Sequence, residues 1–148
     1  MEGQLRMPDK EQEIEIHIPH RLGFEKVAME SAATVAAMMG FSSDRIEDLK
    51  TAVGEACINA IEHGGKGSPH ERILVTLTSN ESELRVDVEN SGDAFPVEHG
   101  KPNIAEKMDG RSPTRGWGLF LIRSLVDKVE FRSHEGTNTT NMVICLDR

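Results

Sequence analysis

The sequence lacks several features that would each point to a particular class of protein. It contains no tyrosine and a single tryptophan, and aromatic residues make up only 4% of its 148 positions. No apolar run approaches the roughly 20 residues that a transmembrane helix needs. Residues 1–12 are polar and charged and contain no signal-peptide core. We therefore expect a cytosolic protein with no membrane partner.

Cysteine and positive charge are also scarce. The two cysteines, Cys57 and Cys145, have no metal-ligand spacing, which is typical of buried free thiols in a reducing compartment. The formal net charge of −8 argues against a nucleic-acid partner, because contacts to phosphate need a basic face. A chain of this length suits one domain. We expect a flexible tail over residues 1–12 and a single domain over 13–148.

The pattern of apolar residues predicts the order strand, two helices, two strands, polar segment, helix, two strands. The strands are expected at 13–18, 72–79, 83–90, 128–133 and about 140–147, and the helices at about 22–39, 42–63 and from about 119. Asp44 and Glu47 have capping-box spacing at the start of the second helix. In the first helix, the inward positions are expected at Phe24, Val27, Ser31 or Ala32, Val35, and Met38 or Met39.

Hairpin connections decide the fold class. The short segment 80–82 predicts that the second and third strands pair as antiparallel neighbours. Hairpins in place of strict strand–helix alternation predict an α+β fold. We expect a two-layer sandwich in which helices cover one face of a mixed, mostly antiparallel sheet.

Three polar residues follow one another at intervals of four in the second helix: Glu55, Asn59 and His63. The apolar positions of the helix place them beside the core stripe rather than opposite it. A carboxylate, a carboxamide and an imidazole at the edge of a buried seam suit the floor of a cleft. The alternative is an ordinary polar helix face that happens to carry Asn and His.

Two later stretches are typical of ligand-binding loops. The strand at 83–90 ends in Asn90-Ser-Gly92, although a plain tight turn would use the same residues. Residues 97–114 are polar and long enough to be either disordered or a functional lid. Gly116 and Gly118 then precede an apolar helix, and a glycine pair at a helix N-terminus suits an anion.

Together, these motifs resemble those of a known family. They read Glu55-x-x-x-Asn59-Ala-x-x-His63-Gly64, Asn90-x-Gly92 and Arg115-Gly-x-Gly118-Leu-x-Leu-Ile. They resemble the ATP-binding (GHKL) domain of histidine kinases, gyrase-type ATPases and one class of heat-shock chaperones. Within that group, the chain is most similar to the small anti-sigma-factor serine kinases of the RsbW type, and the resemblance covers about residues 14–146.

The resemblance implies a Bergerat-type fold, ATP and Mg²⁺ as cofactors, and a role for each motif residue. The resemblance also implies that the protein's partners are a sigma factor and an anti-anti-sigma protein of STAS type. A homodimer is compatible with this resemblance. Glu55 would orient or deprotonate the attacking hydroxyl, and Asn59 would bind Mg²⁺ through its side-chain oxygen. The nucleotide would also be bound by His63, Asn90, Gly92, Arg115, Gly116, Gly118, Leu119 and Thr137, with Arg111 a second basic candidate and Thr139 and Thr140 alternatives to Thr137.

One departure from the family concerns the base. The family usually has Asp where this chain has Asn90, and a second glycine where it has Ala94. An Asn carbonyl accepts a hydrogen bond from the adenine amino group without charge assistance. Asn90→Asp is therefore expected to tighten ATP binding about three- to thirty-fold. Asn90 favours a partner-binding module that holds nucleotide weakly, and Glu55 favours a kinase. A detached histidine-kinase catalytic domain is the third alternative.

Overall fold

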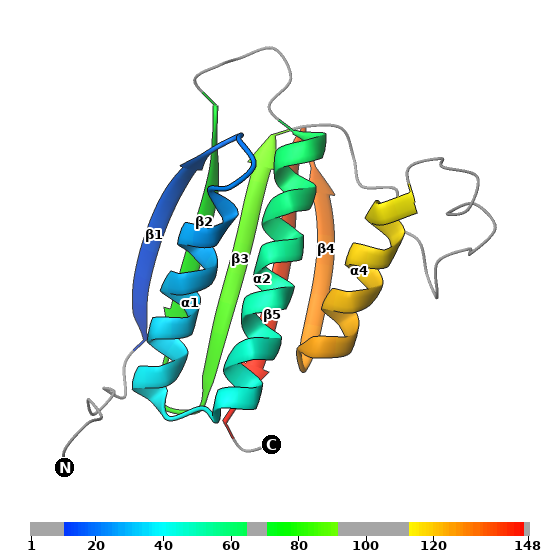
Figure 1. Ribbon diagram of the computed structural model, residues 1–148. Helices are drawn as coiled ribbons and strands as arrows, with labels where there is room; N and C mark the ends of the chain where they lie inside the picture. Colours follow the sequence, from blue (N-terminus) through cyan, green and yellow to red (C-terminus); the bar gives the residue numbers. More distant parts are fainter. Residues whose placement is uncertain (1–10, 65–70, 92–112, 147–148) are drawn as a thin grey trace.

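The computed structural model describes residues 11–64, 71–91 and 113–146 (Figure 1). Within these ranges, the strands form one sheet in the order β1-β2-β3-β5-β4. They are β1 (Gln12–Pro19), β2 (Arg72–Ser79), β3 (Glu83–Ser91), β4 (Lys128–His134) and β5 (Thr137–Cys145). Each of the four pairings is antiparallel. Gln12, expected in the tail, is thus the first residue of β1, and residues 1–10 lie outside the described ranges.

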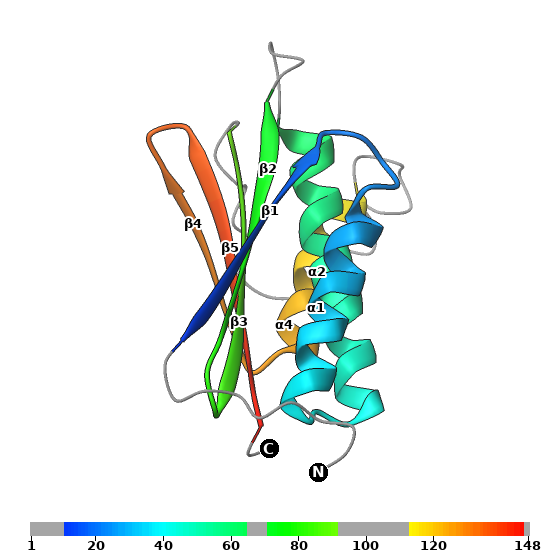
Figure 2. The same ribbon diagram turned by 90° about the vertical axis from the view of Figure 1, so that its left-hand side faces the viewer.

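The described helices are α1 (Glu25–Met39), α2 (Ser43–His63) and α4 (Pro113–Leu125). All three lie on one face of the sheet, as the view along the layers makes plain (Figure 2). The predicted α+β sandwich is confirmed. The hairpin of β2 and β3 is confirmed as well, with Leu77 opposite Val86.

The core fills the space between the sheet and the helices. Alternate strand residues point into it, and eight of them are at most 1% exposed: Ile73, Val75, Leu77, Leu84, Val86, Val88, Met142 and Ile144. The predicted stripe of α2 faces them, with Leu49, Val53, Ala56 and Ala60 buried and Ile46 partly buried. The intervening strand residues form a polar outer face that includes Arg85, Asp87 and Glu89.

The start of α1 differs from the prediction. Gly23 has φ of +108°, in the left-handed region that glycine adopts readily, so the helix cannot begin at residue 22. The buried Glu25 accepts a hydrogen bond from the Gly23 N–H at 2.7 Å. The inward positions are Glu25, Ala28, Ala32, Val35, Ala36 and Met39. The predicted inward positions Phe24 and Val27 are wrong, because small alanines form the surface of α1 that packs inward.

The N-cap of α2 lies two residues earlier than predicted. The Ser42 hydroxyl accepts a hydrogen bond from the Arg45 N–H at 3.3 Å, so the N-cap is Ser42, and the predicted Asp44–Glu47 capping box is wrong. Arg45 also donates through Nη2 to Asp127 Oδ2 at 2.8 Å and to the Cys145 carbonyl at 3.2 Å. This arrangement ties the start of α2 to the end of β5.

The last hairpin is tighter than predicted. Glu135 and Gly136 form a two-residue turn with φ of 51° and 81°, the positive pair that a type I′ turn requires. β5 therefore begins at Thr137, and not near residue 140. This shift matters for the site, because it fixes which threonines of β5 point toward the helices.

Candidate active site

Glu55 and Asn59 lie one turn apart on α2, and α4 passes directly against them. Asn59 is 6% exposed and Glu55 is half-buried. Gly118 of α4 lies opposite: a Cβ built on it would be 2.8 Å from Glu55 Oε1 and 3.6 Å from each amide atom of Asn59. The structure thus brings together residues of the first and third sequence motifs.

The glycines of α4 do not lie where the sequence predicted. The helix begins at Pro113, a residue well suited to a first helical position, so Gly116 and Gly118 lie inside the helix. Only the N–H groups of a helix's first turn lack backbone partners. The predicted position of the glycine pair ahead of the helix is therefore wrong. The structure gives Gly118 a different role, since its missing side chain lets the α4 backbone approach the Glu55 carboxylate.

The environment of Glu55 disfavours its charged form. Burial raises the pKa of the Glu55 carboxyl above its ordinary value, and the nearby Glu62 carboxylate raises it further. A carboxylate with a raised pKa is a stronger base toward a hydroxyl proton. The same desolvation costs stability, since the folded chain must hold a charge away from water.

The variant Glu55→Gln tests this cost. The raised folded pKa means that the folded state retains the proton over a window in which the unfolded state has lost it. The wild type therefore loses stability as pH rises through that window, and the amide does not. We expect the variant to melt on the order of 1–3 °C higher than wild type at pH 7 to 8. Thermal melts at pH 4 should show no such difference, and a lower Tm for the variant at pH 8 would contradict the assignment.

Asn90 lies at the end of β3, on the face that carries Val86 and Val88. It is 5% exposed, and its Nδ2 donates to the Ser91 carbonyl at 3.0 Å. The Asn90 Oδ1 is a hydrogen-bond acceptor, and the amino group of a nucleotide base requires an acceptor. A Cβ built on Gly64 would collide with Asn90 Nδ2, so the end of α2 packs directly on this amide. The first and second motifs are therefore adjacent in space.

The register of β5 separates the three candidate threonines. Thr140 pairs with Val88 and Asn138 with Asn90, and both are at most 3% exposed on the helix-facing side. Thr137 and Thr139 point the other way. Thr140, and not the predicted Thr137, is thus the threonine on the same face as Asn90.

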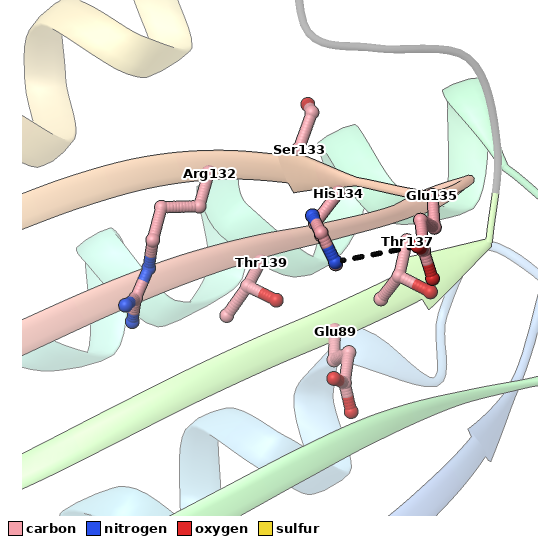
Figure 3. Close-up of a pocket in the computed structure, with 7 residues that line it drawn as sticks. All are labelled: Glu89, Arg132, Ser133, His134, Glu135, Thr137 and Thr139. Carbon is pink, nitrogen blue, oxygen red and sulfur yellow. Dashed lines mark ion pairs between the residues drawn. The ribbon is translucent and has the colours of Figure 1, made fainter.

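Thr137 and Thr139 help to line an open pocket, which Figure 3 shows. It has a volume of about 670 Å³, and its other lining residues are Glu89, Arg132, Ser133, His134 and Glu135. It lies mostly on the polar outer face of the sheet, whereas Glu55 and Asn59 face the helix layer. This pocket is therefore separate from the Glu55–Asn59–Gly118 cluster.

Asn138 was not among the sequence candidates. The Ser133 hydroxyl donates to its Oδ1 at 2.6 Å, beside the Asn90 amide. Strand alternation carries the signal that would have found it, because Asn138, Thr140, Met142 and Ile144 share one face.

The remaining predicted site residues have mixed outcomes. His63 ends α2 with its side chain 32% exposed, near the Asn90 end of the site. Leu119 is 4% exposed within the core cluster. Gly92, Arg111 and lid residues 97–112 lie outside the described residues. Arg115 and Gly116 are placed only as backbone positions of α4.

The donor set fits Mg²⁺ held together with a nucleotide. Among the described residues, no three His, Cys, Asp or Glu side chains converge into a metal cluster. Mg²⁺ retains waters and takes one or two protein ligands beside substrate phosphates. The buried Asn59 side chain, one turn from the Glu55 carboxylate and next to a backbone without a Cβ, offers such a ligand.

The model of the histidine kinase-like ATPase domain family matches residues 19–144. The chain therefore belongs to that family.

Among curated proteins, the serine-protein kinase RsbW of Bacillus subtilis (strain 168) is 30% identical over 127 residues, which cover 83% of this chain and 79% of the relative. RsbW of Listeria monocytogenes (serotype 4a, strain HCC23) is 33% identical over 129 residues, covering 84% and 82%. Within its family, the chain is thus an RsbW-type serine-protein kinase, and the resemblance predicted from its motifs is confirmed.

Solved structures support the fold. The RsbU and RsbW domains of Rv1364c from Mycobacterium tuberculosis match with a TM-score of 0.65 and 18% identity, over 90% of this chain but only 32% of that longer one. The SiaB–SiaC complex from Pseudomonas aeruginosa matches with a TM-score of 0.57 and 14% identity, over 89% of both chains. Across the described ranges, each helix is too short or too polar to span a bilayer.

Proposed function

We propose that this chain binds Mg-ATP and transfers its γ-phosphoryl group to a serine or threonine of an anti-anti-sigma protein, and that it also sequesters a sigma factor in the cytosol. The observation that carries the proposal is the contact of Gly118 with Glu55 and Asn59. Because Gly118 has no side chain, α4 leaves room for the Glu55 carboxylate and the Asn59 amide, which would serve as the general base and the ligand of a hard cation.

The chemistry assigns a separate task to each side chain. Bound Mg-ATP supplies the phosphoryl group and the charge compensation for its transfer. Asn59 would hold the cation through Oδ1. Glu55 would accept the proton of the substrate hydroxyl. The oxygen of that hydroxyl would form the new bond to phosphorus while the bond between phosphorus and the ADP oxygen breaks. The raised pKa of the Glu55 carboxyl suits it to take that proton.

The adenine ring would lie beyond Asn59, at the C-terminal end of α2. Asn90 there offers an acceptor oxygen, with Asn138 and Thr140 on the neighbouring strand. An acceptor at this position favours adenine, which has an amino donor, over guanine, which has a carbonyl at the same place. The buried polar set on β3 and β5 therefore supports ATP as the nucleotide.

The variant Asn90→Asp tests whether residue 90 recognises the adenine base. Asp would put a carboxylate oxygen where Nδ2 now donates to the Ser91 carbonyl, so we expect a lower Tm without nucleotide. This repulsion offsets part of the gain in ATP affinity expected from sequence. The ratio of ATP to GTP affinity should still rise about tenfold, because a carboxylate attracts the amino group and repels the carbonyl. An unchanged ratio in calorimetric titrations would mean that Asn90 does not read the base.

A second candidate function is a partner-binding module that holds nucleotide weakly, and the neutral Asn90 is the observation that favours it. The third sequence-based alternative, a detached histidine-kinase catalytic domain, is not supported by the serine-kinase relatives.

The deciding experiment incubates the purified chain with γ-labelled ATP and each anti-anti-sigma protein of its source organism, with Mg²⁺ or with EDTA. The kinase predicts Mg²⁺-dependent phosphoserine or phosphothreonine on one of them. Binding of that protein without label transfer would favour the module.

A further inference from the structure

The open pocket of about 670 Å³ lies on the face of the sheet opposite α1, α2 and α4 (Figures 2 and 3). A volume of this size suits a small-molecule ligand. One row of residues crosses the pocket, because Glu89 of β3 pairs with Thr139 of β5, and Thr139 pairs in turn with Arg132 of β4. Side chains at paired positions share one face of a sheet. The row therefore has a carboxylate at one end, a hydroxyl in the middle and a guanidinium at the other end.

The protein does not neutralise the two charged ends of this row. Glu89 and Arg132 are two strand spacings apart, which is about 10 Å between their Cα atoms. Within the described part of the chain, neither side chain forms an ion pair or a hydrogen bond. The hydroxyls of Thr137 and Thr139 have no hydrogen-bond partner there either. Four polar side chains in one pocket are thus available to a ligand.

The other two charged residues of the pocket lie next to each other at the hairpin. His134 Nε2 is 3.7 Å from Glu135 Oε2, the contact that the dashed line marks in Figure 3. The Glu135 carboxylate is therefore engaged at the turn. Recognition of a charged ligand falls to Glu89 and Arg132.

These two charges define the chemistry of a matching ligand. A guanidinium binds a carboxylate through two parallel hydrogen bonds, and the Glu89 carboxylate accepts hydrogen bonds from an ammonium group. Thr139 lies between them and offers a methyl group to an aliphatic chain and a hydroxyl to the ligand carboxylate. A ligand with a single charge leaves one end of the row unpaired. In an α-amino acid the two charges are adjacent, so they cannot reach both ends.

We propose that Glu89, Thr139 and Arg132 form a binding site for a small ω-amino acid, whose carboxylate contacts Arg132 and whose ammonium group contacts Glu89. This outer-face site lies on the opposite side of β3 and β5 from Asn90 and Thr140, and it goes beyond the kinase function. Water and salt screen ion pairs in so open a pocket. We therefore expect millimolar affinity that weakens as the salt concentration rises.

Four probe molecules test the proposal. γ-Aminobutyrate carries both charges at the ends of a short chain, butyrate carries only the anion, butylamine carries only the cation, and glycine carries the two charges side by side. Each is titrated into the whole chain while heteronuclear NMR follows the backbone amides of Glu89, Thr139 and Arg132. We expect γ-aminobutyrate to bind at least tenfold more tightly than the other three, with amide shifts confined to the pocket.

Neutral variants show which end of the row binds which charge. In Arg132→Gln, γ-aminobutyrate should bind no better than butylamine, and in Glu89→Gln it should bind no better than butyrate. Glu130→Gln is the matched control, since Glu130 is exposed on the same strand and the same face as Arg132 but does not line the pocket. It should bind like wild type. None of the three changes removes a buried contact, so Tm should be unchanged in all of them.

Three results would overturn the proposal. The first is the lack of an amide shift with γ-aminobutyrate, or equal affinity for γ-aminobutyrate, butyrate and butylamine. The second is an equal loss of binding in Glu130→Gln, since the general charge of the face would then govern binding. The third is a set of amide shifts that follows protein concentration rather than ligand concentration, which would assign this face to a second copy of the chain. These titrations need neither ATP nor a partner protein, so their outcome is independent of the kinase assignment.

Discussion

Replacing Glu55 by glutamine is expected to lower phosphoryl transfer about 10²- to 10⁴-fold, the usual contribution of a general base, with Mg-ATP affinity unchanged. The amide fills the same space beside Gly118 but cannot accept the hydroxyl proton. The same variant should be more stable than wild type at neutral pH, because it removes a charge that burial disfavours. A protein that gains stability and loses turnover separates a chemical role from a structural one.

Asn59→Ala should give the complementary result. It removes the side-chain oxygen assigned to the cation, so ATP affinity should fall in the presence of Mg²⁺ and change little in its absence. Calorimetric titration in both conditions, beside a turnover assay, distinguishes the two residues. Glu47→Gln serves as the matched control for Glu55, since Glu47 lies on the same helix with a 71% exposed side chain. Wild-type binding and turnover in both site variants would remove the assignment.

Gly118→Ala is the second change with a large expected effect. The added Cβ would lie 2.8 Å from Glu55 Oε1, closer than carbon and oxygen pack, so the carboxylate must move. Alanine also favours a helix over glycine by about 1 kcal/mol. We therefore expect turnover to fall at least tenfold, the effect of about 1.4 kcal/mol in the barrier, while Tm stays level or rises.

Gly54→Ala is the control for this substitution. Gly54 also lies inside a helix, and a Cβ there would be 2.8 Å from the Met29 sulfur. The crowding has the same size, but it falls on a flexible thioether between α1 and α2. Turnover should change less in Gly54→Ala than in Gly118→Ala. If the two variants lose turnover equally, crowding of Glu55 is not the cause.

The periodicity of the apolar residues was enough to predict the helices and strands that bury a continuous stripe of apolar side chains. The spacing of Leu49, Val53, Ala56 and Ala60 located α2, and strict alternation located β2 and β3. Sequence failed where one residue acts against its local pattern. Gly23 and the buried Glu25 interrupt an apparent helix, and helical spacing cannot reveal a carboxylate that is satisfied by a turn N–H.

The sequence predicted which residues form the candidate site better than it predicted how they are arranged in space. Glu55 and Asn59 could be paired from their spacing on one helix. Their contact with Gly118 is tertiary, and no local pattern encodes it. The choice between Thr137 and Thr140 depended on the length of one turn. Two positive φ values at Glu135 and Gly136 shorten that turn and place Thr140 on the inner face.

The place of β5 between β3 and β4 has a consequence for synthesis of the protein. A chain emerging from the ribosome can pair β1, β2 and β3 and pack α1 and α2 on them while β5 is still untranslated. Until then β3 presents an open edge, the kind of surface on which nascent chains associate wrongly. Asn90 meanwhile has neither Asn138 nor Thr140 beside it. A nascent chain thus completes this polar cluster only with its last described strand.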